Sequence, residues 1–288
     1  MIALTGAGGF IGSVVLGYLN SQGIDDIVLF DDLPTGSQYK NIVGKQYISL
    51  HSTEEIFQDP KDITCVIHIG ADSSTLTTDW DSLYKTNVLS TRRWNQFCTA
   101  NNIPFIFTSS AAVYGNGNGP LNHYAFSKQV SENEIQGVVL RLFNVYGPNE
   151  YHKGRMASTV YHWYQQLKEN NTLKVFENSN SYRRDFIWVE DVARVIHHFV
   201  NNYHPGIYDV GTGESVSFEI IANCVINEFG SGTKEYIPMP EDLKAQYQLD
   251  TRADTASLSA AGFDTTQLFE PWQGIKEYVK YLKTNQTY

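Results

Sequence analysis

A glycine-rich turn near the start of the chain constrains the fold more than any other feature. The segment Thr5–Gly12 reads TGAGGFIG, and it separates the strand-like run Ile2–Leu4 from a segment with apolar residues at helical spacing. Glycines between a strand and a helix let backbone N–H groups approach a pyrophosphate, which the helix N-terminus also attracts. The pattern therefore predicts a dinucleotide site, with coenzyme contacts expected from Gly6, Gly9, Phe10, Ile11 and Gly12.

Two adjacent carboxylates follow the second strand-like run, Ile27–Phe30. Asp31 lies 19 residues beyond Gly12, where a carboxylate accepts hydrogen bonds from the adenosine ribose. Asp32 stands next to it, and we expect both residues to border the coenzyme. Two carboxylates would repel a 2′-phosphate, and Lys40 is the only lysine close by in sequence. The choice between NAD and NADP is therefore open at this point.

Strand-like and helix-like segments alternate through the first half of the chain. Further strand-like runs cover Ile63–Ile69, Pro104–Thr108 and Val138–Leu142. Strands separated by helices indicate βαβ units, and hence an α/β fold of the Rossmann type with a doubly wound parallel sheet. The second half predicts helices over roughly 158–169, 189–201, 218–229 and 272–283. We expect residues 1–145, with late elements around 186–210, to form the dinucleotide-binding domain, and residues 146–288 to form mainly a smaller, interleaved C-terminal substrate-binding lobe.

Composition excludes several classes of function. The net charge of −10 argues against a nucleic-acid-binding surface. The three cysteines lie far apart and the histidines are scattered, so we expect no metal site. No apolar stretch approaches the ~20 residues that span a bilayer, and no basic leader precedes the first strand. The sequence therefore predicts a cytoplasmic protein that binds neither nucleic acid nor membrane.

A tyrosine and a lysine at helical spacing predict an acid/base pair. Tyr124 and Lys128 lie one turn apart, where the ammonium is expected to lower the pKa of the phenol. The strand-like run before them ends in hydroxyls, and Ser110 is expected to orient a substrate alcohol or ketone. Tyr164 and Lys168 repeat the spacing without such a strand upstream, so we interpret them as a chance match.

Five motifs in order resemble those of the extended short-chain dehydrogenase/reductase family. They are Thr5–Gly12, Thr108–Gly115 (TSSAAVYG), Tyr124–Lys128 (YAFSK), Arg141–Pro148 (RLFNVYGP) and Arg184–Asp191 (RDFIWVED). The resemblance covers most of the chain. It implies a nicotinamide coenzyme that also contacts Gly70, Ala71, Asn87, Lys128 and Val145.

A narrower resemblance lies in the segment His152–Ser158. It reads HKGRMAS and resembles the H-K-G-x-M-A-S segment of ADP-heptose 6-epimerases. That subfamily inverts C6″ of ADP-glycero-manno-heptose, a lipopolysaccharide precursor, and the resemblance implies a homo-oligomer, with a pentamer as the expected form. Because this C–H bond is not acidic, inversion requires oxidation to a ketone and return of the hydride to the opposite face. The resemblance implies that Tyr124 serves one epimer and Lys153 the other. It also implies substrate contacts from Ser73, Asn144, Arg155, His162, Phe176, Ser179, Arg184 and Tyr247.

The chain departs from the subfamily at several positions. Two segments are shorter than is usual there: the loop 115–120, and the helix after Lys128, which is expected to end near 136–137. In addition, Gln38 replaces a common lysine and Arg155 replaces a small residue. Another sugar-nucleotide epimerase, of the UDP-hexose 4-epimerase type, is therefore an alternative. A 4,6-dehydratase is disfavoured because Ala111 and Ala112 stand where that reaction needs an acidic pair. A non-catalytic dinucleotide-binding protein is a third alternative.

Overall fold

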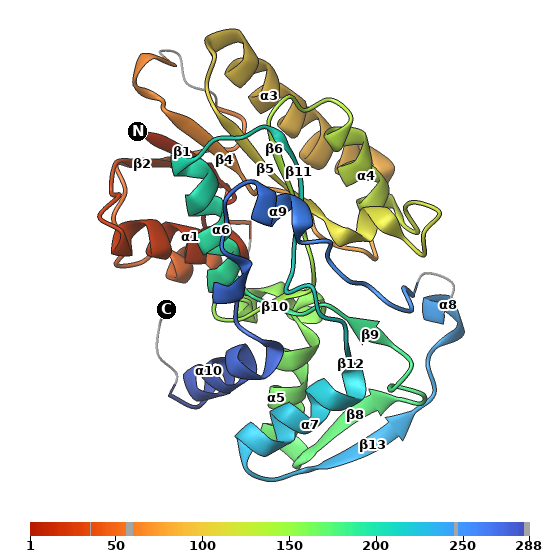
Figure 1. Cartoon of the computed structure of the whole chain (residues 1–288). Helices are drawn as coiled ribbons and strands as arrows, with labels where there is room; N and C mark the ends of the chain where they lie inside the picture. Colours follow the sequence, from red (N-terminus) through yellow and green to blue (C-terminus); the bar gives the residue numbers. More distant parts are fainter. Residues whose placement is uncertain (35, 56–59, 245–246, 285–288) are drawn as a thin grey trace.

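A seven-stranded parallel sheet forms the centre of the computed structural model, which describes residues 1–34, 36–55, 60–244 and 247–284. The strands lie in the order β11-β6-β5-β4-β1-β2-β3 (Figure 1). The order runs outwards in both directions from β1 and β4, which creates a crevice at the carboxyl ends of these two strands. The strands are β1 (Ile2–Thr5), β2 (Ile27–Phe30), β3 (Ser49–His51), β4 (Cys65–His68), β5 (Phe105–Ser110), β6 (Val138–Leu142) and β11 (Gly206–Val210).

Helices cover both faces of the sheet. Alternate strand residues pack on opposite sides: Leu4 and Leu29 share one apolar cluster with α1 (Phe10–Ser21) and α6 (Val189–Asn201). Val28 and Phe105 belong to a second cluster with α3 (Ser90–Asn101). Strands buried on both faces are typical of parallel sheets. The predicted doubly wound α/β fold is therefore confirmed.

Most of the second half of the chain has its own apolar core below the sheet (Figure 1). This part of the molecule is called the lower lobe here. Its strands β8 and β13 pair in parallel, β9 pairs antiparallel with β12, and β7 pairs in parallel with β10. The elements are β7 (Val145–Tyr146), α5 (Thr159–Asn170), β8 (Thr172–Phe176), β9 (Arg183–Arg184), β10 (Ile187–Trp188), β12 (Val216–Ser217), α7 (Phe218–Phe229), β13 (Thr233–Ile237) and α10 (Pro271–Thr284).

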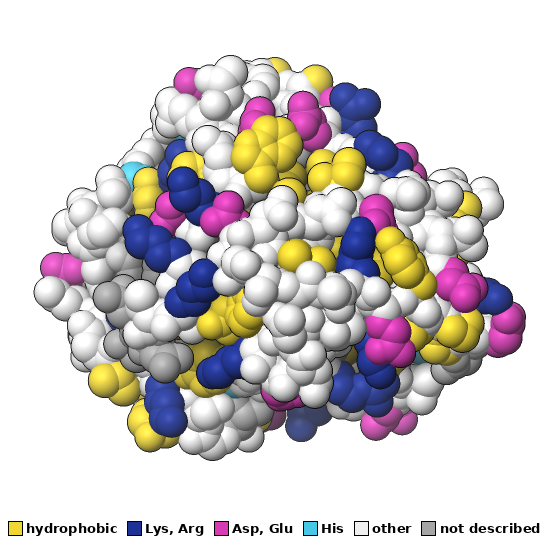
Figure 2. Space-filling model, turned by 90° about the horizontal axis from the view of Figure 1, so that it is seen from below, with side chains coloured by type: hydrophobic (Ala, Val, Ile, Leu, Met, Phe, Trp, Pro, Cys, Tyr) yellow, Lys and Arg dark blue, Asp and Glu magenta, His cyan; other side chains and the backbone are white. Residues whose placement is uncertain are grey.

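The chain passes back and forth between the two cores, because α6 and β11 return to the sheet from the second half. Seen from below, the molecule presents Lys and Arg side chains spread among several separate apolar groups (Figure 2). None of the described helices is long and apolar enough to cross a membrane.

Short elements complete the chain. They are η1 (Gln38–Asn41), η2 (Pro60–Asp62), α2 (Trp80–Leu83), the π-helical η3 (Tyr84–Leu89), η4 (Ala111–Tyr114), α4 (His123–Glu132), η5 (Tyr151–Met156), α8 (Glu241–Lys244), α9 (Ala256–Ala260) and η6 (Thr265–Gln267). Two of the expected boundaries differ in an informative way. The strand expected from Ile63 begins only at Cys65, because the Ile63 N–H closes η2 on the Pro60 carbonyl. The helix that carries Lys128 ends at Glu132, earlier than expected.

Candidate active site

The glycine-rich turn joins β1 to α1 at the crevice of the sheet. Gly6 has φ +68, and a Cβ there would lie 2.6 Å from the Gly70 nitrogen after β4. A Cβ at Gly12 would lie 2.0 Å from the Gly6 carbonyl oxygen. The turn is therefore closed by backbone packed directly on backbone. Such a cradle in front of a helix N-terminus fits the pyrophosphate of a dinucleotide.

Asp31 and Asp32, both predicted to border the coenzyme, form hydrogen bonds with different parts of the chain. Asp31 accepts hydrogen bonds from the backbone N–H groups of Gly8 (2.9 Å) and Leu33 (2.8 Å), and so lies on the turn. Asp32 accepts from the hydroxyls of Ser52 and Thr53 after β3, and from the Thr53 N–H at 3.0 Å. Partial burial pushes the pKa of Asp32 up, but the hydrogen bonds from Thr53 and Ser52 hold that pKa below its ordinary value. Asp31 is thus the carboxylate that lies on the glycine-rich turn.

Asn87, in the π-helical η3, joins the loop after β4 to α4. Its Oδ1 accepts from the Asp72 N–H at 2.8 Å, and its Nδ2 donates to the Asp72 carbonyl at 3.0 Å. The same amide donates to Ser127 Oγ at 2.9 Å. Ser127 lies between Tyr124 and Lys128 in sequence. Asn87 therefore fixes the loop that carries Gly70, Ala71 and Ser73 against the helix of the predicted acid/base pair.

Tyr124 lies in the first turn of α4, which Asn122 caps by accepting from the Ala125 N–H. Burial raises the pKa of Tyr124; a hydrogen bond with Ser110 acts in the opposite direction, and the nearby Asp72 adds to the rise. The expectation that Lys128 lowers the pKa of the phenol below its ordinary value is therefore wrong for the protein groups alone. Burial outweighs the favourable contact with Ser110.

Lys128 is 3 % exposed, and its Nζ donates to the Thr108 carbonyl at 2.9 Å. The same atom lies 4.7 Å from the centre of the Phe107 ring. Burial lowers the pKa of this ammonium to about 7. By contrast, Tyr164 of the chance match is buried in the core of the lower lobe, edge-on to Phe229, as expected of a core residue.

Lys153 reaches the start of α1 from η5. Its Nζ lies 5.5 Å from the centre of the Phe10 ring, directly after the glycine-rich turn. Burial lowers the pKa of Lys153, and the buried Glu150 opposes this shift. Glu150 itself accepts from the N–H and hydroxyl of Ser158, the N-cap of α5. The structure thus brings Lys153 to the predicted coenzyme site.

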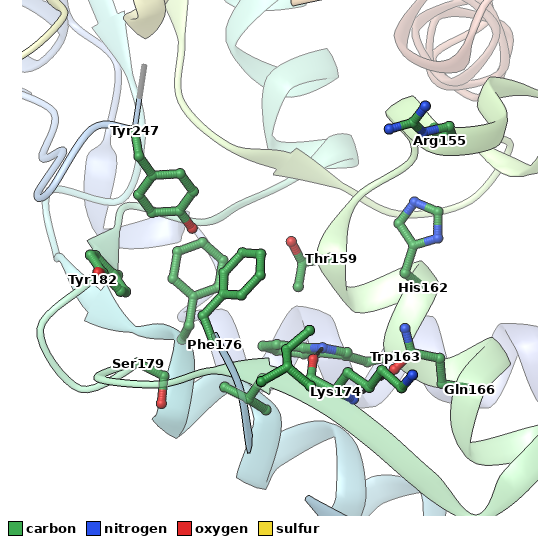
Figure 3. A pocket seen from close by; sticks show the side chains of 13 residues that line it. Arg155, Thr159, His162, Trp163, Gln166, Lys174, Phe176, Ser179, Tyr182 and Tyr247 are labelled. Carbon is green, nitrogen blue, oxygen red and sulfur yellow. Dashed lines mark hydrogen bonds between the residues drawn. The ribbon is translucent and has the colours of Figure 1, made fainter. Parts of the chain in front are cut away.

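A pocket of about 380 Å³ lies in the lower lobe (Figure 3). Arg155 and His162 stand on one side of it and Tyr247 and Tyr182 on the other (Figure 3). Ser179 also lines the pocket, but its hydroxyl donates to Glu219 of α7 at 2.6 Å. Five predicted substrate residues therefore meet here: Arg155, His162, Phe176, Ser179 and Tyr247.

Sequence reasoning missed several lining residues. Thr159, Trp163 and Gln166 were detectable, because they follow the face of α5 that carries His162 at helical spacing. Lys174 and Tyr182 carry no such signal. The other predicted contacts lie outside this pocket: Asn144 is exposed between β6 and β7, Val145 begins β7, and Ser73 lies in the loop after β4.

Arg184 lies against two aromatic residues of the pocket. Its guanidinium carbon is 4.8 Å from the Tyr247 ring centre and 5.6 Å from that of Phe218. The residue is 6 % exposed, and its Nη1 donates to the Arg183 carbonyl at 2.7 Å. Burial lowers its pKa, while Tyr247 and Asp250 oppose the shift. Among the described residues no carboxylate forms an ion pair with it. A buried cation without an ionic partner is suited to an anionic ligand.

A second hollow, of about 750 Å³, opens at the first turns of α4. It lies between residues 75–78 and the segment 120–129, and its lining includes Asn122, His123 and Phe126 but not Tyr124. Pro120, at the end of the short 115–120 loop, is among its lining residues. No group of three metal-ligating side chains occurs in the described part of the chain.

Comparison with known proteins identifies the family. The sequence profile of the NAD dependent epimerase/dehydratase family matches residues 2–211. The chain belongs to this family. The predicted resemblance and the nicotinamide coenzyme are thereby confirmed, with NAD named by the family description.

A curated relative matches the whole chain. The ADP-L-glycero-D-manno-heptose-6-epimerase of Brachyspira hyodysenteriae is 38% identical over 318 residues, which cover 100% of this chain and 99% of the relative. Among solved structures, an NAD dependent NDP-hexosamine 5,6-dehydratase involved in tunicamycin biosynthesis has a TM-score of 0.84 at 23% identity, covering 99% of this chain and 98% of its own. The Helicobacter pylori ADP-L-glycero-D-manno-heptose-6-epimerase has a TM-score of 0.82 at 24% identity, covering 98% and 96%. At these identities the solved structures support the fold alone.

Proposed function

We propose that this chain inverts C6″ of an ADP-linked glycero-manno-heptose. The observation that carries the proposal is the full-length similarity, at 38% identity, to an ADP-L-glycero-D-manno-heptose-6-epimerase. Two features of the site support it: Tyr124 stands beside Ser110, and Lys153 lies at the glycine-rich turn. The reaction exchanges two epimers and consumes no co-substrate.

The glycine-rich turn and Asp31 would hold the coenzyme, with the loop after β4 on the other side of the crevice. The bound coenzyme would supply a reversible hydride acceptor at the carbon that is inverted. Both NAD and NADP are kept as candidates. Residues 1–145, with the late elements around 186–210, are proposed as the part that binds it.

Tyr124 is proposed to remove and return the hydroxyl proton of one epimer, with Ser110 orienting the oxygen. Because the protein groups alone raise the pKa of this phenol, the positive charge of the oxidised coenzyme is needed to make it a base near neutral pH. Lys128 is buried one helical turn from Tyr124, and its ammonium, when protonated, would add positive charge beside the phenol.

Lys153 is proposed to serve the other epimer. Burial lowers the pKa of its ammonium, which favours proton exchange near neutral pH. The variant Lys153→Met is expected to lose epimerisation in both directions, because each turnover needs both groups. Lys168→Met, at the exposed lysine of the chance match, is the matched control. Equal rates in Lys153→Met and the wild type would eliminate this role.

The pocket of the lower lobe is proposed to hold the nucleotide part of the substrate. Arg184 is the residue suited to the diphosphate, because it is a buried cation that stacks on Tyr247. Arg155 and His162 line the opposite side (Figure 3). Asn144 and Ser73 lie outside this pocket and are proposed to contact the sugar nearer the sheet.

The substrate is tested by incubation with ADP-D-glycero-D-manno-heptose and, in parallel, with UDP-glucose. Proton NMR distinguishes the C6″ epimers of the first and the C4″ epimers of the second. We expect inversion of the heptose only. Inversion of UDP-glucose alone would replace this function with that of a hexose 4-epimerase. Turnover of neither nucleotide sugar would contradict the proposal.

Three further properties are proposed on the resemblance: a homo-oligomer with a pentamer as the expected form, a cytoplasmic location, and a place in making a lipopolysaccharide precursor. Light scattering of the purified chain measures the first. A mass of one protomer would contradict it.

A further inference from the structure

Asn41, at the end of η1, makes contacts that no feature of the predicted site explains. It is 3 % exposed, and its Nδ2 donates to the Gly8 carbonyl in the glycine-rich turn at 2.9 Å. The same nitrogen lies 3.3 Å from the Asn149 carbonyl and 3.3 Å from His152 Nδ1. One buried amide therefore touches both the coenzyme turn and the segment that leads into Lys153.

Other contacts bind the same two regions together. Asn149, which has φ +72, donates from its Nδ2 to Ser13 Oγ of α1 at 3.0 Å. The Tyr151 hydroxyl donates to the Ser37 carbonyl at 3.3 Å. Segment 149–152 is thus held against α1 and residues 37–41. Asn41 is the member of this group that also reaches the turn itself.

Two acceptor carbonyls orient the amide group of Asn41. Its Nδ2 faces two carbonyls, which fixes the identity of the nitrogen. The two N–H groups suffice for the two carbonyls, so His152 Nδ1, 3.3 Å away, is a third close contact whose donor or acceptor role depends on the tautomer. Burial lowers the pKa of this histidine, which favours the neutral ring. Its Oδ1 is buried without a hydrogen-bond partner among the described residues. The side chain therefore donates to the two carbonyls even though leaving its buried oxygen without a hydrogen bond costs free energy.

We propose that Asn41 is a positioning residue that couples the glycine-rich turn to Lys153. A dinucleotide bound at the turn would restrain the Gly8 carbonyl. Because Asn41 contacts this carbonyl, Asn149 and His152, it would then restrain the segment 149–152 as well. Lys153, one residue further on, is then held over Phe10. The inference rests on the proposed role of Lys153, but the coupling itself requires only the coenzyme.

Hydrogen exchange measures the coupling without substrate. The backbone N–H groups of Lys153 and Ala157 bond to the carbonyls of Glu150 and Gly154, so their exchange reports on the order of this segment. Saturating NAD or NADP, whichever binds, is expected to slow exchange in 150–157 about tenfold in the wild type. In Asn41→Ala the slowing is expected to fall below threefold.

Asn20→Ala is the matched control. Asn20 also donates from Nδ2 to two carbonyls, those of Ile24 and Gln46, but at the far end of α1. It should keep the wild-type protection. Equal protection in Asn41→Ala and the wild type would refute the coupling. If Asn41→Ala does not fold, His152→Ala cuts the same connection at a half-buried side chain; undiminished protection in that variant would refute it equally.

Turnover then separates positioning from a general loss of structure. Asn41→Ala is expected to lower kcat about tenfold with KM changed less than threefold. In a His152→Ala background, which cuts the same connection, the substitution should have a much smaller effect, because both residues act on the segment that leads to Lys153. An undiminished loss in that background would overturn the inference. If the chain does not epimerise ADP-heptose, the proposed function fails, but the hydrogen-exchange experiment still tests the coupling because it needs no substrate.

Discussion

Replacing Arg184 with methionine separates ligand binding from stability. Arg184 is a buried cation stacked on Tyr247, 4.8 Å from the ring centre, and it has no carboxylate partner among the described residues. Hydrogen bonds to charged groups contribute about 1.5–3 kcal/mol each. Two such bonds to a diphosphate, partly replaced by water in the variant, give a loss of about 2–4 kcal/mol, or roughly 30- to 1,000-fold in affinity.

Stability should respond in a different way. Methionine keeps a polarisable contact with the Tyr247 ring and removes the cost of burying an unpaired charge. The lost cation–π contact and the hydrogen bond to the Arg183 carbonyl act in the opposite direction. We therefore expect the free energy of unfolding of Arg184→Met to stay within about 1 kcal/mol of the wild type.

Calorimetric titration with ADP-glucose and with adenosine makes the test specific. Only ADP-glucose carries the diphosphate, so only its affinity should fall in Arg184→Met. Arg183→Met is the matched control, because Arg183 is the neighbouring residue and its guanidinium donates to the Ser215 carbonyl. Equal affinity of wild type and Arg184→Met for ADP-glucose, or an equal loss for adenosine, would refute this role for Arg184.

Three further predictions concern the coenzyme side of the site. Tyr124→Phe should lower kcat by roughly 10²–10⁴ while coenzyme affinity, measured by fluorescence titration, stays the same; a loss under tenfold would contradict its acid/base role. Gly12→Ala should weaken coenzyme binding and lower stability by about 1–3 kcal/mol, because its Cβ would lie 2.0 Å from the Gly6 carbonyl, whereas Gly36→Ala meets open space and should change neither. Burial lowers the pKa of Lys128 to about 7, below its unfolded value, so its cost to stability is fully present below pH 7 and fades as pH rises towards 10. Lys128→Met should therefore raise Tm at pH 6–7, and a gain that grows with pH would contradict this.

The fold was predictable because its signals are local and repeated. Parallel strands buried on both faces leave apolar runs, and the glycine-rich turn is confined to Thr5–Gly12, so β2, α6 and α7 begin and end at the residues expected from the sequence. The beginning of β4 was missed because a backbone bond from Ile63 closes η2 first. Such competition between neighbouring turns is invisible in a pattern of side chains.

The sequence placed several expected substrate residues together in one pocket, but it did not predict the electrostatics around Tyr124. Five expected substrate residues do line one pocket, since a family motif carries their identity across sequence distance. The pKa of Tyr124 could not be deduced from the spacing to Lys128, because it depends on how completely the phenol is buried. Likewise, the turn of the Ser179 hydroxyl towards Glu219 follows from the packing of α7, which no local pattern describes.

The hydride path tests the central proposal most directly. ADP-D-glycero-D-manno-heptose carrying deuterium at C6″ is incubated with the enzyme in ordinary water, and the product is followed by proton NMR and mass spectrometry. Oxidation and re-reduction at one bound coenzyme predict inversion with the deuterium kept at C6″. Inversion with deuterium lost to water, or no inversion at all, would contradict the account.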